Sequence, residues 1–306
     1  MNAGRTETTG NEQRKTEKEG ITVKFAMYSR FIPTLARLGA EKTAEELLRL
    51  GLTHAEVLEV TGGKSPRVID DTRTAEELRK TFAARGLGFA CYSVGTTLWQ
   101  NPDAERELLF HAELAAALGS PYLHHTLLSW LRLPECPPDR DEALQFAAEA
   151  AVRVANAAKP LGITCIYEDQ GLYANGVGGF GTFYAEVKRV CDNVGVCGDM
   201  GNTLFAGEEP EDFFRAYAGE IRHVHVKDYI RKHAPEQPGR YWLPVEGGRN
   251  GNWVRDTFVG DGTVNISACM EILRSVGYDG VFALELEHPE PFEEGILQAE
   301  RVLTRA

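Results

Sequence analysis

The stretch IRHVHVKD, residues 221–228, begins as an apolar run and ends in polar side chains, and three other runs end in the same way. They are ITCIYED (163–169), VGVCGD (194–199) and GVFALELE (280–287), each followed by a turn and a helix-like stretch. Short apolar runs that alternate with helical stretches predict parallel strands in βα units. In a (β/α)8 barrel, side chains at the C-terminal strand ends meet at one mouth, where the chemistry takes place. The four polar strand ends therefore predict one shared site.

The alternation of strand and helix repeats eight times along the chain. The expected strands are 21–28, 55–60, 88–94, 122–127, 163–168, 194–199, 221–228 and 280–287. The expected helices lie near 43–50, 74–85, 102–118, 139–159, 180–191, 210–218, 266–276 and 291–303. Eight units without a change of order favour a closed barrel, and no GxGxxG follows the first strand as a dinucleotide-binding sheet would need. The sequence predicts an α/β fold, a single (β/α)8 TIM barrel.

The barrel is expected to span residues 21–306, after a disordered N-terminal tail at residues 1–20 that lacks the apolar segment of a secretory signal. One long connection, residues 229–265, breaks the rhythm of short loops and contains prolines, glycines and two tryptophans. A long connection on the C-terminal side of a barrel often serves as a lid or specificity loop. A surface excursion or an oligomer contact is the alternative.

Composition is that of a globular enzyme rather than a nucleic-acid or membrane protein. The chain has 306 residues, of which 43% are hydrophobic and 25% charged, and a net charge of −12. This acidity disfavours nucleic acid and anionic membranes, and no apolar run approaches the ~18 residues of a membrane span. Six cysteines without a CxxC pair indicate free thiols in a reducing compartment. We expect a cytoplasmic homo-oligomer that binds a small molecule.

Four side chains at the C-terminal strand ends are the candidate metal ligands: Glu168, Asp199, His225 and Glu285. Three carboxylates and one imidazole suit a divalent ion such as Mn²⁺, Mg²⁺, Co²⁺ or Zn²⁺. Strand side chains alternate by two, so Glu287 shares a face with Glu285 and is the alternative fourth ligand.

Other polar and aromatic side chains are candidates for substrate binding. The alternation in HVHVKD places His223 deep in the barrel and Lys227 at its rim. Glu59, near the end of the second strand, would bind a hydroxyl group, pair with Lys227 or form a structural salt bridge. His124, the first of two adjacent histidines on the fourth strand, is expected to face the lumen. The candidate substrate-binding residues are Asn202, Lys227, Glu59, His124, Glu287 and Trp253.

Several phrases resemble the sugar phosphate isomerase/epimerase family of xylose-isomerase-like TIM barrels. They are VGVCGDMGNT (194–203), IRHVHVKDY (221–229), VGDGTVNISACMEILRSVGYDG (259–280) and FALELEH (282–288). The resemblance runs from about residue 21 to the C-terminus. The family includes ketose 3-epimerases, hydroxypyruvate isomerase and inosose dehydratase.

The resemblance implies a metal-dependent isomerase or epimerase acting on a keto-sugar or polyol. In the family's epimerases, the glutamates that correspond to Glu168 and Glu285 bind one divalent ion and are also catalytic. They exchange a proton beside a carbonyl through a metal-stabilised enediolate, for which Mn²⁺ is the first expectation. The alternative is a lyase on the same scaffold, inosose dehydratase-like or acting by 3-keto-glycoside β-elimination, with Lys227 as the acid. A noncatalytic sugar-binding barrel is a third class.

Two positions depart from the family pattern. Asn202 and Gly95 stand where many members carry histidine. These differences count against the endonuclease IV branch, which uses three zinc ions and additional histidines.

Overall fold

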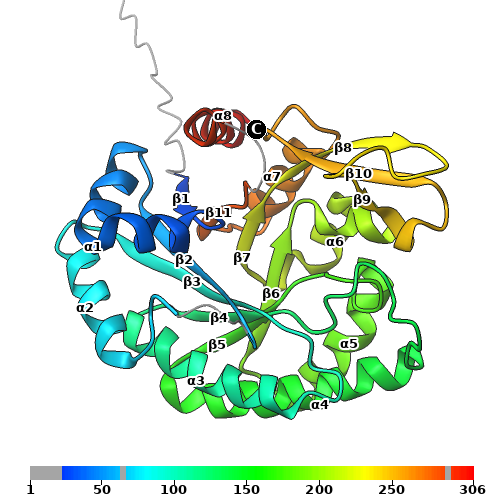
Figure 1. Cartoon of the computed structure of the whole chain (residues 1–306), viewed down its shortest axis with the longest axis horizontal. Coiled ribbons are helices and arrows are strands. Elements are labelled where there is room, and N and C mark those ends of the chain that lie inside the picture. The colour runs from blue at the N-terminus through cyan, green and yellow to red at the C-terminus, as the bar shows by residue number, and fades with distance from the viewer. Residues whose placement is uncertain (1–22, 63–66, 287–290) are drawn as a thin grey trace, which may run out of the picture.

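The computed structural model describes residues 23–62, 67–286 and 291–306, in which eight parallel strands close a barrel (Figure 1). The predicted TIM barrel is confirmed, whereas the expected tail at residues 1–20 lies outside the described residues. Neighbouring strands follow the order β1, β11, β7, β6, β5, β4, β3 and β2 around the barrel. Their bounds are Lys24–Met27 (β1), His54–Val60 (β2), Gly88–Gly95 (β3), Tyr122–His125 (β4), Thr164–Tyr167 (β5), Val194–Asp199 (β6), Ile221–Val226 (β7) and Val281–Leu284 (β11).

Each barrel strand is followed by an α-helix on the outside of the barrel, and each helix overlaps one of the expected helical stretches. The helices are Phe31–Arg49 (α1), Thr72–Ala83 (α2), Pro102–Leu118 (α3), Arg140–Ala158 (α4), Gly176–Val190 (α5), Pro210–Tyr217 (α6), Ile266–Ser275 (α7) and Phe292–Arg305 (α8). Short 3-10 helices lie at Lys159–Leu161 (η1), Asn202–Ala206 (η2) and Ala218–Glu220 (η3). Within the described residues, no helix is long and apolar enough to cross a membrane.

Helix α1 begins earlier than the sequence indicated. The helix was predicted near residues 43–50, whereas the structure has it at Phe31–Arg49. Gly39, inside the helix, has a φ of 73°. The helix is kinked at this glycine, so its apolar periodicity is interrupted there. The sequence pattern therefore does not reveal the first half of the helix.

The two faces of the barrel strands differ in chemistry. Tyr92 and Tyr167, which are fully buried, lie on the side that packs against the helices, where Tyr92 contacts His111 and Tyr167 contacts Phe183. The inward-facing side chains are instead largely polar and buried; they include Glu56, Ser93, His124, His223 and His225. A buried polar interior needs internal partners for its hydrogen bonds, so it is organised as a connected network.

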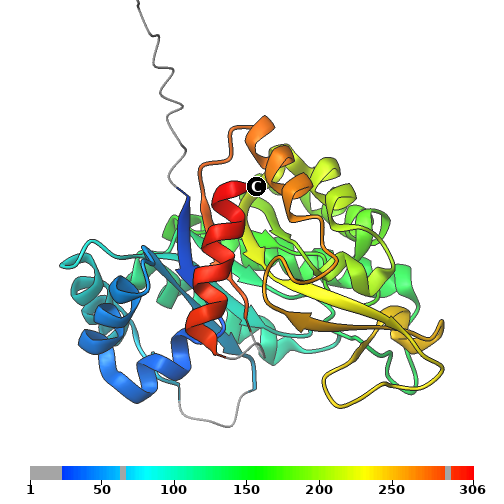
Figure 2. The ribbon, with the colours of Figure 1, turned by 90° about the horizontal axis from the view of Figure 1, so that it is seen from above.

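The long connection after β7 contains a small antiparallel sheet. Its strands are Asp228–His233 (β8), Leu243–Pro244 (β9) and Asn252–Thr257 (β10), with a short 3-10 helix, Val245–Gly248 (η4), between β9 and β10. β10 is the central strand of the three. The sequence predicted a long loop at 229–265 without strands, because the exposed side chains along β8 weaken the apolar alternation that reveals a strand. Figure 2 shows this sheet at one side of the barrel.

Asp228 holds the two ends of this insertion together. Its Oδ2 accepts hydrogen bonds from the backbone N–H groups of Gly260 and Gly262, both at 2.9 Å. Its Oδ1 accepts the N–H groups of Tyr229 at 2.8 Å and Val264 at 3.1 Å. The segment therefore leaves the barrel and returns to it at one buried carboxylate.

Candidate active site

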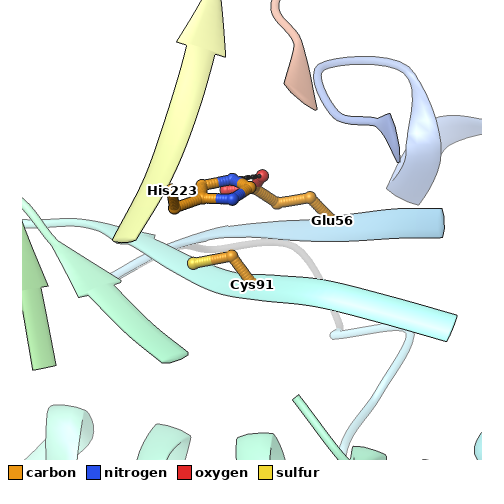
Figure 3. Close-up of side chains that lie close together, drawn as sticks. All are labelled: Glu56, Cys91 and His223. Carbon is orange, nitrogen blue, oxygen red and sulfur yellow. Dashed lines mark hydrogen bonds and ion pairs between the residues drawn. The ribbon is translucent and has the colours of Figure 1, made fainter. Parts of the chain in front are cut away.

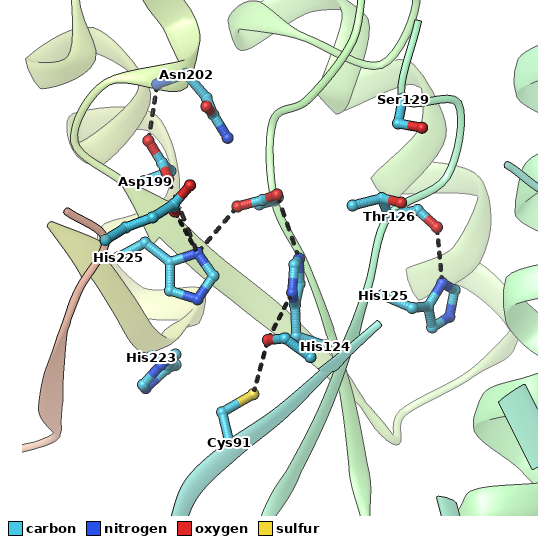
Figure 4. Close-up of polar contacts among 12 residues, drawn as sticks. Cys91, His124, His125, Thr126, Ser129, Asp199, Asn202, His223 and His225 are labelled. Carbon is cyan, nitrogen blue, oxygen red and sulfur yellow. Dashed lines mark hydrogen bonds and ion pairs between the residues drawn. The ribbon is translucent and has the colours of Figure 1, made fainter. Parts of the chain in front are cut away.

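The four predicted metal ligands come together at the C-terminal mouth of the barrel. His225 Nδ1 lies 3.1 Å from Glu168 Oε2, 3.7 Å from Glu285 Oε2 and 3.8 Å from Asp199 Oδ2. Three side chains are buried, while that of Glu285 is 17% exposed and forms the open side of the cluster. Figure 4 shows Asp199 and His225 directed into one space, with His124 across from them.

The donor set of this cluster fits a divalent metal ion. Asp199 Oδ1 accepts the N–H groups of Gly201 and Asn202, both at 2.8 Å, so Oδ2 is the oxygen left for the site. His225 Nδ1 faces three carboxylates, and Tyr28 stacks on its ring at 4.6 Å between centroids. Carboxylate oxygens around one imidazole nitrogen are the ligands that Mn²⁺, Mg²⁺ and Zn²⁺ accept, and so much buried negative charge needs a compensating cation.

Lys227 provides part of that compensation. Its buried ammonium group lies 2.9 Å from Asp199 Oδ2 and 2.8 Å from Glu285 Oε1, and it donates to Asn202 Oδ1 at 3.2 Å. Burial alone would lower the pKa of Lys227, but the carboxylates of Asp199 and Glu285 outweigh it and raise that pKa well above its usual value. Lys227 is therefore a charged hydrogen-bond donor at the floor of the site.

The surroundings of the two glutamates shift their pKa values in opposite directions. Burial raises the pKa of Glu285 to about 7, with Asp199 adding to the effect and Lys227 opposing it. Burial has the same tendency at Glu168, but the hydrogen bond to His225 and the positive charges of His225 and Lys227 oppose it and lower its pKa. One carboxylate is thus ionised at neutral pH while the other readily carries a proton, which is the pattern of a base and an acid.

A cavity of about 310 Å³ opens above these residues. Lys227, Glu285 and Asn202 form part of its polar lining, and Phe205 and Tyr229 supply aromatic surface. The insertion contributes Arg240, Tyr241, Leu243 and Asp256 to the wall. A pocket with a charged end and partly apolar walls suits a small polyhydroxylated molecule.

The other predicted substrate-binding residues fall into different places. His124 faces the lumen, with its Nε2 3.5 Å from Glu168 Oε1. Glu59 lies three residues after the inward-facing Glu56 on β2. Burial raises the pKa of its carboxyl group, and the positive charge of Arg67 partly opposes this effect. Trp253 is buried in the insertion, where its indole N–H donates to the Ala234 carbonyl at 3.0 Å. It lines a separate cavity.

Glu287, the alternative fourth ligand, lies outside the described residues. Among the described residues after β11, Glu285 is the glutamate that reaches the cluster.

Glu56, a fully buried carboxylate in the middle of β2, is not among the site residues predicted from the sequence. Its Oε1 lies 3.0 Å from His225 Nε2 and its Oε2 lies 2.6 Å from His223 Nε2. The available signal was a glutamate inside the apolar run HAEVLEV, which requires a buried partner if the run is a strand. The register shift between Ala55 and Glu56 against β3 obscured which face it occupies.

The fold and the site define a class: a (β/α)8 barrel with an acidic, imidazole-containing cluster at the C-terminal strand ends. The family description "Xylose isomerase-like TIM barrel" matches residues 44–306, and the chain belongs to this family.

Comparison with individual proteins agrees with this assignment. An inosose dehydratase from Lacticaseibacillus casei is 27% identical over 272 residues, covering 83% of this chain and 85% of the relative. The solved structure of 3-keto-D-glucoside 4-epimerase from E. coli superimposes with a TM-score of 0.68 at 15% identity, covering 93% of this chain and 100% of the other. A xylose isomerase-like TIM barrel protein from Mycobacterium smegmatis, in complex with magnesium, has a TM-score of 0.66 at 18% identity and coverages of 92% and 96%.

Proposed function

We propose that this chain is a divalent-metal-dependent isomerase or epimerase of a keto-sugar or keto-polyol. The observation that carries the proposal is the convergence of Glu168, Glu285 and Asp199 on His225 Nδ1, at 3.1, 3.7 and 3.8 Å. The ligands proposed for the ion are Glu168, Asp199, His225 and Glu285, and Mn²⁺ is the ion proposed first. When bound, such an ion polarises a carbonyl oxygen and stabilises the negative charge that develops on it.

Glu168 and Glu285 then transfer the substrate proton. Glu168 removes a proton from the carbon beside the substrate carbonyl, and the electron pair of that C–H bond moves toward the carbonyl oxygen. For epimerisation, Glu285 returns a proton to the opposite face of the same carbon. For isomerisation, it returns the proton to the former carbonyl carbon, and the hydroxyl proton of the first carbon passes to the former carbonyl oxygen. Lys227 donates a hydrogen bond to a substrate oxygen, while the cavity wall from the insertion limits access of water.

A second candidate is a dehydratase, which two observations favour. The relative from Lacticaseibacillus casei is an inosose dehydratase, and the ammonium group of Lys227 lies 2.8 Å from Glu285 Oε1. In this reaction Glu168 removes the proton beside the carbonyl, a carbon–carbon double bond forms, and the hydroxyl group on the next carbon leaves. A proton from Lys227 or Glu285 completes the water molecule, so the reaction needs no further co-reactant.

One experiment separates these reactions. The protein is loaded with Mg²⁺, which is diamagnetic, and incubated in D₂O with ketoses, inososes and 3-keto-glucosides while proton NMR spectra are recorded. Deuterium entering at one carbon beside the carbonyl, with a new stereoisomer or positional isomer, supports the isomerase or epimerase. Loss of a hydroxyl group with formation of an enone supports the dehydratase. Absence of both exchange and product across the panel contradicts the enolising function, provided that metal analysis shows a loaded site.

A further inference from the structure

Glu56 on β2 connects three inward-facing side chains from two other strands, β3 and β7. Oε1 accepts the hydroxyl proton of Ser93 at 2.5 Å and lies 3.0 Å from His225 Nε2, while Oε2 lies 2.6 Å from His223 Nε2. All four residues are buried, with exposed fractions of 1% or less. Figure 3 shows the imidazole of His223 against the Glu56 carboxylate, with Cys91 beside them.

The trio in Figure 3 has the composition of a second metal site, since ligand atoms of Glu56, Cys91 and His223 lie within 4.8 Å of one another. Its donors are already occupied, however, because both Glu56 oxygens face imidazole nitrogens. Burial raises the pKa of the Cys91 thiol well above its usual value, so it remains a neutral thiol, 3.8 Å from Ser93 Oγ. Hydrogen bonding therefore accounts for this trio within the barrel interior.

The hydrogen-bond partners of Glu56 determine which nitrogen of His225 carries a proton. An ionised carboxylate only accepts hydrogen bonds, so the Nε2 atoms of His223 and His225 must both carry protons. When His225 is neutral, a proton on Nε2 leaves the lone pair on Nδ1. That lone pair is directed at Glu168, Asp199 and Glu285, where the ion is proposed to bind.

The Glu56 carboxylate also determines the tautomer of His124, through Ser93. The single hydroxyl proton of Ser93 is donated to Glu56, so its oxygen must accept the Nδ1 proton of His124, which lies at 3.0 Å. The lone pair of His124 is then on Nε2, which is buried without a hydrogen-bond partner among the described residues and lies 3.5 Å from Glu168 Oε1. Figure 4 shows His124 in this orientation across from His225.

We propose that Glu56 is a positioning residue that sets the tautomers of both active-site histidines. It holds the proton of His225 on Nε2, which leaves Nδ1 to bind the metal ion, and through Ser93 it holds the proton of His124 on Nδ1. His124 Nε2 then accepts a hydrogen bond from a substrate hydroxyl group beside Glu168. The part concerning His225 rests on the proposed metal site, whereas the part concerning His124 does not.

The first test reads the tautomers in the unaltered protein. Long-range proton–nitrogen NMR spectra of ¹⁵N-histidine-labelled protein are recorded without metal and with Zn²⁺, and signals are assigned with single-site histidine variants. We expect His124 protonated on Nδ1 in both states, and His225 protonated on Nε2 alone once Zn²⁺ is bound. A proton on His124 Nε2, or a Zn²⁺-loaded His225 protonated on Nδ1, overturns the proposal. Failure of Zn²⁺ to bind contradicts the proposed metal site instead, and His124 in the metal-free protein still decides this proposal.

The second test uses Glu56→Leu with Ser93→Ala as its matched control. Leucine offers no acceptor, so the proton of His225 is no longer held on Nε2. We expect Zn²⁺ affinity, measured by competition with a chelating dye, to fall about 10- to 100-fold, the usual effect of losing an outer partner of a histidine ligand. Ser93→Ala should leave Zn²⁺ affinity unchanged and alter only the His124 signals. Wild-type Zn²⁺ affinity in a folded Glu56→Leu protein overturns the proposal; if that variant does not fold, the tautomers of the unaltered protein decide.

Discussion

Lys227 Nζ lies 2.8 Å from Glu285 Oε1, so a buried ammonium group and a proposed metal ligand form a direct ion pair in the metal-free chain. The same nitrogen lies 2.9 Å from Asp199 Oδ2, a second proposed ligand. A fixed positive charge at this distance opposes the binding of a divalent cation, and we propose that the same ammonium group donates a hydrogen bond to the substrate.

Replacing Lys227 should separate these two effects. In Lys227→Met the cationic repulsion is removed, so we expect metal affinity, measured by calorimetry with Mn²⁺, to stay equal or to rise. We expect kcat to fall by about 10²-fold or more, the scale of losing one hydrogen-bond donor to the developing negative charge. Weaker Mn²⁺ binding in the folded variant would show that Lys227 supports the ion rather than competing with it.

The two glutamates should be needed for turnover in addition to any role as ligands. Glu168→Gln and Glu285→Gln each keep a carbonyl oxygen for the ion but lose the group that transfers the proton. We expect activity to fall by roughly 10²-fold or more with metal still measurable by elemental analysis. His225→Ala, in contrast, should lose most of its metal, and Glu186→Gln on the outer surface of α5 should behave as wild type. Near-normal turnover in either metal-loaded glutamine variant contradicts the proton-transfer role.

Metal affinity should increase with pH through the neutral range. In the metal-free chain Glu285 carries a proton below its pKa of about 7, and the ion must displace that proton in order to bind. Affinity therefore falls as pH drops below 7. Burial lowers the pKa of His225, but Cys197, Glu56 and Glu168 outweigh it and raise that pKa well above its usual value, so release of the His225 proton continues the pH dependence above 7. Calorimetry in buffers of different ionisation enthalpy counts the protons; binding of Mn²⁺ without proton release would refute this.

Gly262 should be essential to the anchor of the insertion. A Cβ at this position would collide with Asp228 Oδ1, so Gly262→Ala requires either the backbone or the carboxylate to move. We expect a loss of about 1–3 kcal/mol in the free energy of unfolding, the usual cost of an overpacked site. Gly178→Ala is the matched control, because nothing lies within 4 Å of its Cβ and its helical backbone accepts alanine, which should stabilise by about 0.4–1 kcal/mol. Equal stability of the two variants in urea unfolding would show that the anchor tolerates a side chain.

Shortening the insertion should alter substrate use without removing the metal. His233 and Asn252 are paired across β8 and β10, so residues 234–251 can be replaced by an Asn-Gly turn that joins the two strands as a hairpin. The variant loses Arg240, Tyr241 and Leu243 from the cavity wall. We expect KM to rise roughly tenfold, equivalent to about 1.4 kcal/mol of lost binding. Unchanged KM and substrate preference would exclude a lid or specificity role, and a change only in oligomeric state would assign the segment to an interface.

The sequence could predict those parts of the molecule that repeat. Glu168, Asp199 and His225 each end a strand in successive βα units, so the eightfold alternation places them at one mouth without knowledge of any contact. Glu56 could not be placed in this way, because its partner His223 lies 167 residues away and only closure of the barrel brings β2 and β7 across the same interior. The insertion was also read as a loop, because its strands have too little apolar alternation to reveal pairing.

Because Asp228 holds both ends of the insertion, substrate selectivity can change there independently of the chemistry at the strand ends. The segment begins and ends at hydrogen bonds to one side chain, so residues can be gained or lost at its tip without changing the alignment of β7 with β11. Insertions or deletions at the tip would leave the proposed proton-transfer residues in place. In this fold a new substrate preference can therefore arise through changes in loop length as well as through substitutions next to the reacting atoms.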